Sequence, residues 1–327
     1  MGTKTYIYKY VPTHYHMVYH ETRIVNGIKK NYLVKNSRSN GRFIKKSKFI
    51  GTGDIPKKKI EELKKEYERE LFLSNEYEFL TKEQVNEIED AKQIYNKKIK
   101  ELNREEYEKF ENSFFTELTY NSNAIEGSSL SIEDTSLIVN ENIAPEGKTI
   151  REINEAKNHI KALEFIKNYK GDFSEEFILK LHSIILKDIS ERFSGKYRQT
   201  QVRIFGSDVK FPNSEKVPQL IKNLIYWYKK NKTKHHQFEL AVLVSMKFVT
   251  IHPFVDGNGR VSRLIMNFLL QKKEYPWINV YRKRREKYLK AVRKANDEDY
   301  SLIIQSLIEN LKENLKDFGF TDSHSIL

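Results

Sequence analysis

The chain has 327 residues, of which 39% are apolar, 12% aromatic and 31% charged, and its formal net charge is +13. This composition excludes a disordered chain and favours one large domain or a main domain with an appendage. The positive charge favours anionic partners, which include nucleotides, nucleic acids, acidic proteins and anionic lipids, without choosing among them. The sequence has no cysteine, which excludes disulfides and thiolate zinc sites and leads us to expect a cytoplasmic protein. The most apolar run, 240–254, is too short for the roughly 20 residues of a membrane span, so we expect no membrane partner.

Residues 1–55 are expected to form a small basic β-hairpin region of unknown role. Two stretches rich in β-branched and aromatic residues, 30–38 and 42–50, lie on either side of Asn40-Gly41. This dipeptide tolerates the positive φ angles of a tight hairpin turn. Residues 56–109 are highly charged, and their apolar residues recur at helical spacing, which predicts a helical appendage. These apolar residues are Ile60, Leu63, Tyr67 and Leu71.

The main domain is expected at 110–311, followed by a C-terminal tail at 312–327. Its apolar periodicity is helical almost throughout, and Ser131, Ser174 and Ser214 provide helix start signals. One segment, 197–212, alternates like a short β-hairpin around Gly206. The predicted fold class is therefore mostly α, a helical bundle with a short β-hairpin flap, preceded by the basic hairpin and the helical appendage.

The segment 252–260 carries the chemistry, because it places a base, a carboxylate, a tight turn and an arginine in one loop between two helices. It reads His-Pro-Phe-Val-Asp-Gly-Asn-Gly-Arg. The small residues 257–259 allow a turn that directs several backbone N–H groups to one place at the start of a helix, where a phosphate can bind. Asp256 offers a hard oxygen ligand for Mg²⁺. Arg260 and Arg263 can bind phosphate oxygens, and His252 lies beside them as a base.

This loop resembles that of the Fic family, whose pattern is His-Pro-Phe-any-(Asp or Glu)-Gly-Asn-(Gly or Lys)-Arg. The sequence matches every fixed position, and a chance match has a probability on the order of one in ten million. The resemblance covers about 110–311. It implies a protein adenylyltransferase that moves AMP from Mg-ATP to a Ser, Thr or Tyr hydroxyl of a protein. Its cofactors are then ATP and Mg²⁺, with His252 as catalytic base and Asp256 as metal ligand.

The resemblance also implies which residues bind the nucleotide. In the loop and the helix after it, these are Gly257, Asn258, Gly259, Arg260 and Arg263; in the flap, Ile204, Phe205, Gly206 and Ser207; on a late helix, Tyr288 and Asn296.

A second resemblance concerns control. Ser122-Asn123-Ala124-Ile125-Glu126-Gly127 matches the family's inhibitory pattern, (Ser or Thr)-three residues-Glu-(Gly or Asn). This implies an inhibitory helix at about 111–127, with Ser122 and Glu126 as regulatory residues. Gly127 is a plausible helix stop. We expect Glu126 to pair with Arg260 and so to keep that guanidinium from the nucleotide.

Three alternatives remain open at this point. The same site can remove AMP from a modified protein, with Glu126 aligning a water, or it can transfer another phosphate-containing group. The third alternative is a nucleic-acid-binding regulator whose hairpin contacts phosphates. Its basic residues are Arg38, Arg42, Lys45, Lys46 and Lys48. The protein substrate is unidentified, and self-modification and a homodimer are compatible with the resemblance.

Overall fold

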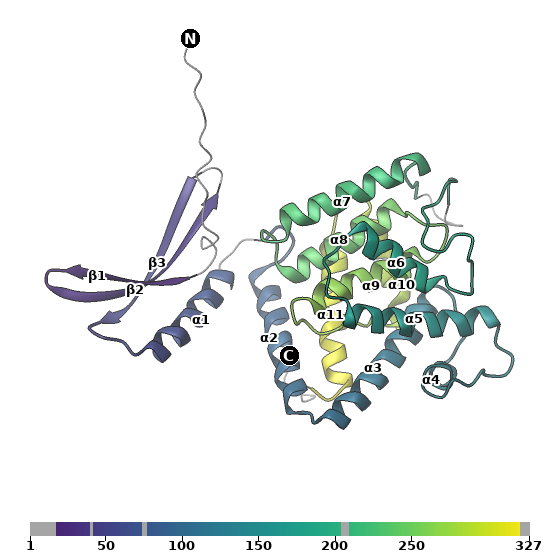
Figure 1. The fold of residues 1–327 in the computed structure, drawn as a ribbon, viewed down its shortest axis with the longest axis horizontal. Coiled ribbons are helices and arrows are strands. Elements are labelled where there is room, and N and C mark those ends of the chain that lie inside the picture. The colour runs from purple at the N-terminus through teal and green to yellow at the C-terminus, as the bar shows by residue number, and fades with distance from the viewer. Residues whose placement is uncertain (1–17, 40–41, 74–76, 204–208, 321–327) are drawn as a thin grey trace, which may run out of the picture. The chain divides into compact units, whose positions relative to one another are not determined.

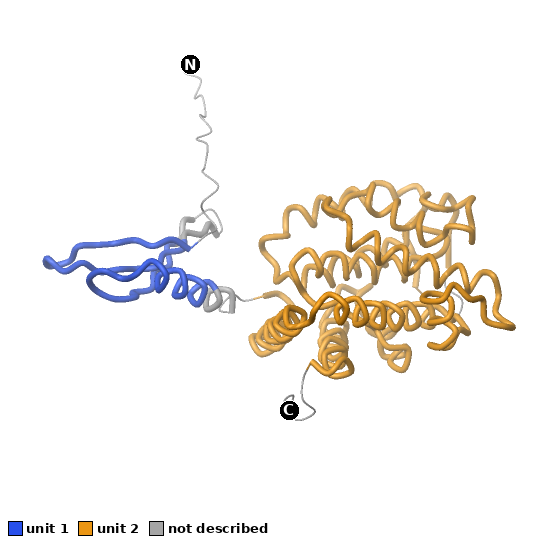
Figure 2. The backbone as a smooth tube through the Cα atoms, turned by 60° about the horizontal axis from the view of Figure 1, so that its bottom comes forward, with its two compact units in different colours: residues 1–76 blue, residues 77–327 orange. Residues whose placement is uncertain are grey.

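The computed structural model describes residues 18–39, 42–73, 77–203 and 209–320 (Figure 1). The chain divides into two compact units, residues 1–76 and 77–327 (Figure 2). This single division replaces the expected boundaries at 55 and 109. Helix α2 (Lys82–Glu101) belongs to the C-terminal unit, where Lys312 on α11 forms a salt bridge of 2.9 Å with its Glu87.

The N-terminal unit is a three-stranded antiparallel sheet with one helix. Strands β1 (Tyr19–Val25), β2 (Ile28–Ser39) and β3 (Arg42–Thr52) pair in that order, and α1 spans Lys57–Leu73. The predicted pairing of 30–38 with 42–50 is present as β2 and β3. Helix α1 covers one face of the sheet through an apolar cluster. The cluster contains Val18, Leu33, Tyr67, Ile50, Ile60 and Leu63.

The C-terminal unit is a helical bundle around α8 (Gln237–Ile251) and α9 (Asn258–Gln271). These two helices pack against each other and are buried along almost their whole length, because apolar residues occupy nearly every face of α8. The surrounding helices are α2, α3 (Arg104–Ile125), α4 (Ile132–Asn140), α5 (Ile150–Asn168), α6 (Glu175–Ile185), α7 (Val217–Asn231), α10 (Arg285–Ala295) and α11 (Ser301–Asp317). Figure 1 shows most of them around α8 and α9, while α4 lies at the outer edge of the bundle and packs on α3 and α5.

Local signals explain several of the helix boundaries. Ser131 and Ser174 cap α4 and α6 as predicted, since each side chain accepts a hydrogen bond from an orphan backbone N–H of the first turn. Ser214 begins a 3₁₀ turn that leads into α7. Gly127, at φ 106°, follows the end of α3. Within the described residues, no helix has the length and apolar character needed to cross a membrane.

Two expectations need correction. Residues 312–317 are not a tail, because α11 continues to Asp317 with Leu315 buried at helical spacing from Leu311. The described arms of the flap, 197–203 and 209–212, contain no strand. The buried Arg198 guanidinium donates hydrogen bonds to carbonyl oxygens on both arms, Thr200 O and Pro212 O. The Gln201 side-chain amide, which donates to Phe211 O, joins the arms in place of a β-ladder. The predicted tip residues Ile204, Phe205, Gly206 and Ser207 lie outside the described residues.

Candidate active site

The loop between α8 and α9 is held in a tight conformation by its own polar groups. His252 ends α8 at φ 50°, and Gly257 precedes α9 at φ 79°, a left-handed conformation that glycine adopts without steric cost. The Asn258 side chain closes the loop. Its Oδ1 accepts a hydrogen bond from Phe254 N at 3.0 Å, and its Nδ2 donates to Phe254 O at 2.9 Å. The Asn258 carboxamide therefore shapes the loop and is not free to bind phosphate, whereas the first backbone amides of α9 have no intrahelical acceptor.

His252 is placed as a neutral base. Its Nδ1 lies 3.3 Å from Val249 O, and its ring stacks on Phe211 at 4.0 Å. A carbonyl can only accept a hydrogen bond, so Nδ1 carries the proton and Nε2 keeps its lone pair. Burial lowers the pKa of His252 to about 4. The imidazole is therefore unprotonated at neutral pH and ready to accept a proton at Nε2.

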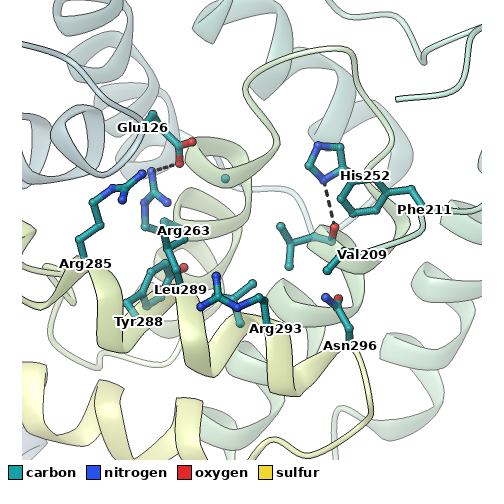
Figure 3. Close-up of a pocket in the computed structure, with 13 residues that line it drawn as sticks. Glu126, Val209, Phe211, His252, Arg263, Arg285, Tyr288, Leu289, Arg293 and Asn296 are labelled. Atoms are coloured by element: carbon teal, nitrogen blue, oxygen red, sulfur yellow. Dashed lines mark hydrogen bonds and ion pairs between the residues drawn. The ribbon is translucent and has the colours of Figure 1, made fainter. Parts of the chain in front are cut away.

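A pocket of about 300 Å³ opens beside His252 (Figure 3). Six of the predicted site residues line it, and they come from α3, α8, α9 and α10. They are Glu126, His252, Gly259, Arg263, Tyr288 and Asn296. The Asn296 side chain is fixed by a hydrogen bond of 2.8 Å from Thr250 Oγ1 to its Oδ1. The structure thus brings together residues that lie as far apart as 170 positions in the sequence.

Four lining residues on or at the start of α10 were not predicted. They are Arg285, Leu289, Val292 and Arg293. Arg285, Leu289, Val292 and Asn296 follow one another at intervals of four, three and four residues, which places them on one face of a helix. This spacing could have identified them from the sequence. Arg285 also reaches the end of α3, since its Nε donates a hydrogen bond of 2.8 Å to Ile125 O.

Glu126 pairs with Arg263, so the expected pairing with Arg260 is wrong. Glu126 Oε1 lies 2.8 Å from Arg263 Nη2, and the Arg263 guanidinium also donates to Ser122 O at 2.8 Å and to Ser122 Oγ at 3.1 Å. Arg260 points elsewhere and pairs with Glu155 on α5 at 3.2 Å. Residues three apart on a helix project in directions about 60° from each other, so α9 presents one arginine to α3 and the other to α5.

The carboxylate of Glu126 lies against the first turn of α9. A Cβ atom built on Gly259 would collide with Glu126 Oε1. Glycine at position 259 is therefore what permits this close approach. The approach puts a negative charge at the amino end of a helix, where the orphan amides and the macrodipole stabilise an anion.

Asp256 is an ionised carboxylate at the edge of the site. Burial raises its pKa, but the attraction of Arg260 and the hydrogen bond from Gly257 N–H outweigh this effect, and the pKa is lowered overall. Arg151 Nη2 contacts Asp256 Oδ2 at 2.5 Å. Among the described residues no cluster of three or more metal-ligating side chains exists. A single carboxylate nevertheless fits Mg²⁺, which takes its other ligands from waters and nucleotide phosphates.

Comparison with known proteins agrees with this geometry. Residues 172–270, which include α6, α7, α8, the complete loop and all of α9 but its last residue, match the model of the Fic/DOC family. Residues 172–270 therefore carry a Fic/DOC domain. Two proteins named protein adenylyltransferase Fic are similar to it. The one from Drosophila melanogaster is 31% identical over 200 residues, or 60% of this chain and 40% of the relative. The one from Nematostella vectensis is 34% identical over 185 residues, or 55% of this chain and 43% of the relative.

Solved Fic structures share the fold. A Fic domain containing signalling protein from Bacteroides thetaiotaomicron superposes with a TM-score of 0.64 at 26% identity, over 70% of this chain and 95% of that one. Fic-1 from C. elegans gives a TM-score of 0.63 at 24% identity, over 72% of this chain and 70% of that one. The chain spans about two fifths of the length of the curated relatives it matches.

Proposed function

We propose that the Fic domain transfers AMP from Mg-ATP to a hydroxyl of a protein. The observation that supports this best is that one pocket is lined both by His252, whose Nε2 keeps its lone pair, and by the amino end of α9. In the reaction, the target oxygen attacks the α-phosphorus and the bond to the α–β bridging oxygen breaks. Pyrophosphate leaves, and His252 Nε2 takes the hydroxyl proton. A positioned base of this kind contributes about 10²–10⁴-fold.

The remaining residues bind and orient the nucleotide. Backbone amides at 258–259 bind phosphate oxygens, and Tyr288 and Asn296 line the part of the pocket that takes the adenosine. Asp256 would hold Mg²⁺, which offsets the charge of the phosphates when bound. Arg263 is suited to the β- and γ-phosphates. Its buried guanidinium lines the pocket and already binds an anion there, the carboxylate of Glu126, which a phosphate can replace.

Glu126 restrains this reaction in our proposal. Its carboxylate occupies Arg263 and lies against Gly259 in the first turn of α9, which are the groups that the phosphates need. ATP must therefore displace Glu126 or bind with its phosphates misplaced. The Glu126 side chain is 38% exposed and lines the pocket, so a carboxylate that aligns water for AMP removal is the competing interpretation.

Isotopic labelling tests these proposals. The wild-type chain, Glu126→Gly and Glu126→Gly with His252→Ala are incubated with Mg²⁺ and ATP labelled at the α- or the γ-phosphate, and label on protein is followed, self-modification included. We expect α-label on Glu126→Gly, less on wild type and none on the double variant. Label from the γ-phosphate would mean phosphoryl transfer and would refute the proposal. Loss of AMP removal from a modified protein in Glu126→Gly, without any gain in transfer, would make Glu126 a hydrolytic residue.

A further inference from the structure

The positive charge of the chain is concentrated outside the Fic domain. Residues 1–76 contain 17 Lys and Arg against 8 Asp and Glu, which is +9 of the total +13. Within 19–52, the span of the sheet, nine residues are basic and Glu21 is the single acid. AMP transfer as described above uses none of these residues. We propose that the sheet of the N-terminal unit is a binding site for double-stranded DNA.

The face of the sheet opposite α1 combines cations with aromatic rings. By register, Arg23, Tyr32, Lys45 and Phe49 share this face. The Arg23 guanidinium lies over the Tyr32 ring at 4.2 Å, and the Phe49 ring is 5.5 Å from Tyr32 and 51% exposed. Glu21 bridges Arg23 at 2.7 Å and Lys45 at 2.8 Å. The cations of this face can donate hydrogen bonds to phosphates, and its aromatic rings can contact sugars and thymine methyl groups.

Like charges lie directly opposite each other at two places in the sheet. Arg23 on β1 faces Lys30 on β2, and Lys35 on β2 faces Lys46 on β3. Such pairs destabilise a sheet. Within the described ranges, no acidic side chain forms a salt bridge with Lys30, Lys35 or Lys46. A bound polyanion would offset both repulsions. The stability that the free protein loses to these like-charge pairs therefore indicates an anionic partner.

The distribution of these cations favours a duplex groove over other anionic partners. Lys30 shares the face opposite α1, whereas Lys35 and Lys46 share the face of Leu33, on which α1 packs. A sheet in the major groove turns one face to the base edges and has a phosphate backbone along each of its two edges, where long lysine side chains that leave either face can reach it, while a flat bilayer meets one face only. Single strands bind by stacking bases on open ring faces, but Arg23 already covers one face of Tyr32. The arrangement of basic residues on the sheet therefore fits a duplex best.

Anisotropy titrations of the 327-residue chain with a fluorescent 20-base-pair duplex, over a range of salt concentrations, test this proposal. The test variant is Lys30→Gln, Lys35→Gln and Lys46→Gln combined. The control removes the same charge from exposed lysines of the Fic unit, as Lys170→Gln, Lys180→Gln and Lys187→Gln. Each lost phosphate contact should lower the slope of log K against log salt by about 0.9, so the test variant should lose up to about 2.7 and the control nothing.

Stability provides a second measurement. Because the test variant removes like-charge repulsion, its unfolding midpoint should equal or exceed that of wild type, so weak binding cannot be attributed to misfolding. Transfer of α-label to protein should be the same in test variant and wild type. The proposal is overturned by absence of duplex binding at low salt, by an unchanged salt slope in the test variant, or by tighter binding to a single strand of the same sequence. Binding to anionic vesicles but not to duplex would also overturn it.

Discussion

The contact between Glu126 and Arg263 offers the sharpest test of the proposed control. We predict that Glu126→Gln weakens the resting state and raises AMP transfer, because the guanidinium of Arg263 loses a charged partner and becomes available to phosphate. Arg263 is only 7% exposed, but it keeps its hydrogen bonds to Ser122 O and Oγ. After the substitution the guanidinium therefore has no counter-ion but keeps hydrogen-bond acceptors.

The size of the effect follows from burial. Breaking a fully buried pair costs about 3–5 kcal/mol, and a hydrogen bond to a charged group contributes about 1.5–3 kcal/mol. Glu126 is 38% exposed, so water replaces part of the interaction. We expect the free energy of unfolding to fall by about 1–2 kcal/mol, and a restraint of that size corresponds to a factor of about 5–30 in the transfer rate.

A double-mutant cycle distinguishes the two arginines. Urea unfolding is measured for Glu126→Gln, for Arg263→Ala and for the two combined, and the same cycle is repeated with Arg260→Ala. The coupling to Arg263 should be about 1 kcal/mol or more, whereas the effects at Glu126 and Arg260 should add to within about 0.5 kcal/mol. Equal coupling to both arginines, or coupling to Arg260 alone, would refute the assignment of the inhibitory contact. An unchanged transfer rate in Glu126→Gln would refute the restraint.

Three further predictions concern His252, the glycines at the start of α9, and His159 on α5. His252→Ala should lower transfer by at least about 100-fold while ATP affinity, measured by calorimetry, stays within a few-fold of wild type, because the base acts on the hydroxyl proton; strong loss of ATP binding would contradict that role. Gly259→Ala should displace the Glu126 carboxylate and raise self-modification, whereas Gly257→Ala, which strains φ 79°, should lower stability by about 1 kcal/mol without activation. Burial lowers the pKa of His159 from 6.5 to about 3, so the unfolded state takes up the proton first as pH falls, and stability is lost below about pH 6.5. His159→Gln should therefore reduce the loss of unfolding free energy between pH 7 and pH 5 by about 2 kcal/mol; an unchanged pH dependence would show that His159 titrates normally in the folded protein.

Local chemistry made much of the fold and site predictable from sequence. The turn residues at 257–259, the helix caps at Ser131 and Ser174, and the stop at Gly127 all act within a few positions along the chain. Strand β1 was missed although Asn26-Gly27, which joins it to β2 with φ angles of 52° and 73°, has the same turn signal as Asn40-Gly41. The short, polar strand before that turn has little apolar alternation, so its pairing depends on β2 more than on its own sequence.

Interactions between distant elements were less predictable. The alternating residues at 202, 204, 209 and 211 suggested a hairpin, but Arg198 takes carbonyls on both arms of the flap, and Gln201 Nε2 donates to Phe211 O at 2.9 Å. Neither contact has a periodic signature in the sequence. Likewise, sequence identifies Glu126 as a candidate partner for an arginine of α9 but does not give the rotation of α9 about its axis, which decides between two arginines three residues apart.

The rotation of α9 about its axis determines which of its two arginines Glu126 can reach. Arg260 is tied to Glu155 at 3.2 Å and lies 3.4 Å from Asp256 Oδ1, so it supports the catalytic loop from the side of α5. Arg263 is tied to α3 through Ser122 and Glu126. In the proposed control, the Glu126 contact therefore acts on one arginine while the other keeps Asp256 and the loop in place. A carboxylate bound to Arg260 would disturb Asp256, the proposed metal ligand, as well, whereas the proposed restraint at Arg263 is one that phosphate can displace while the rest of the site stays assembled.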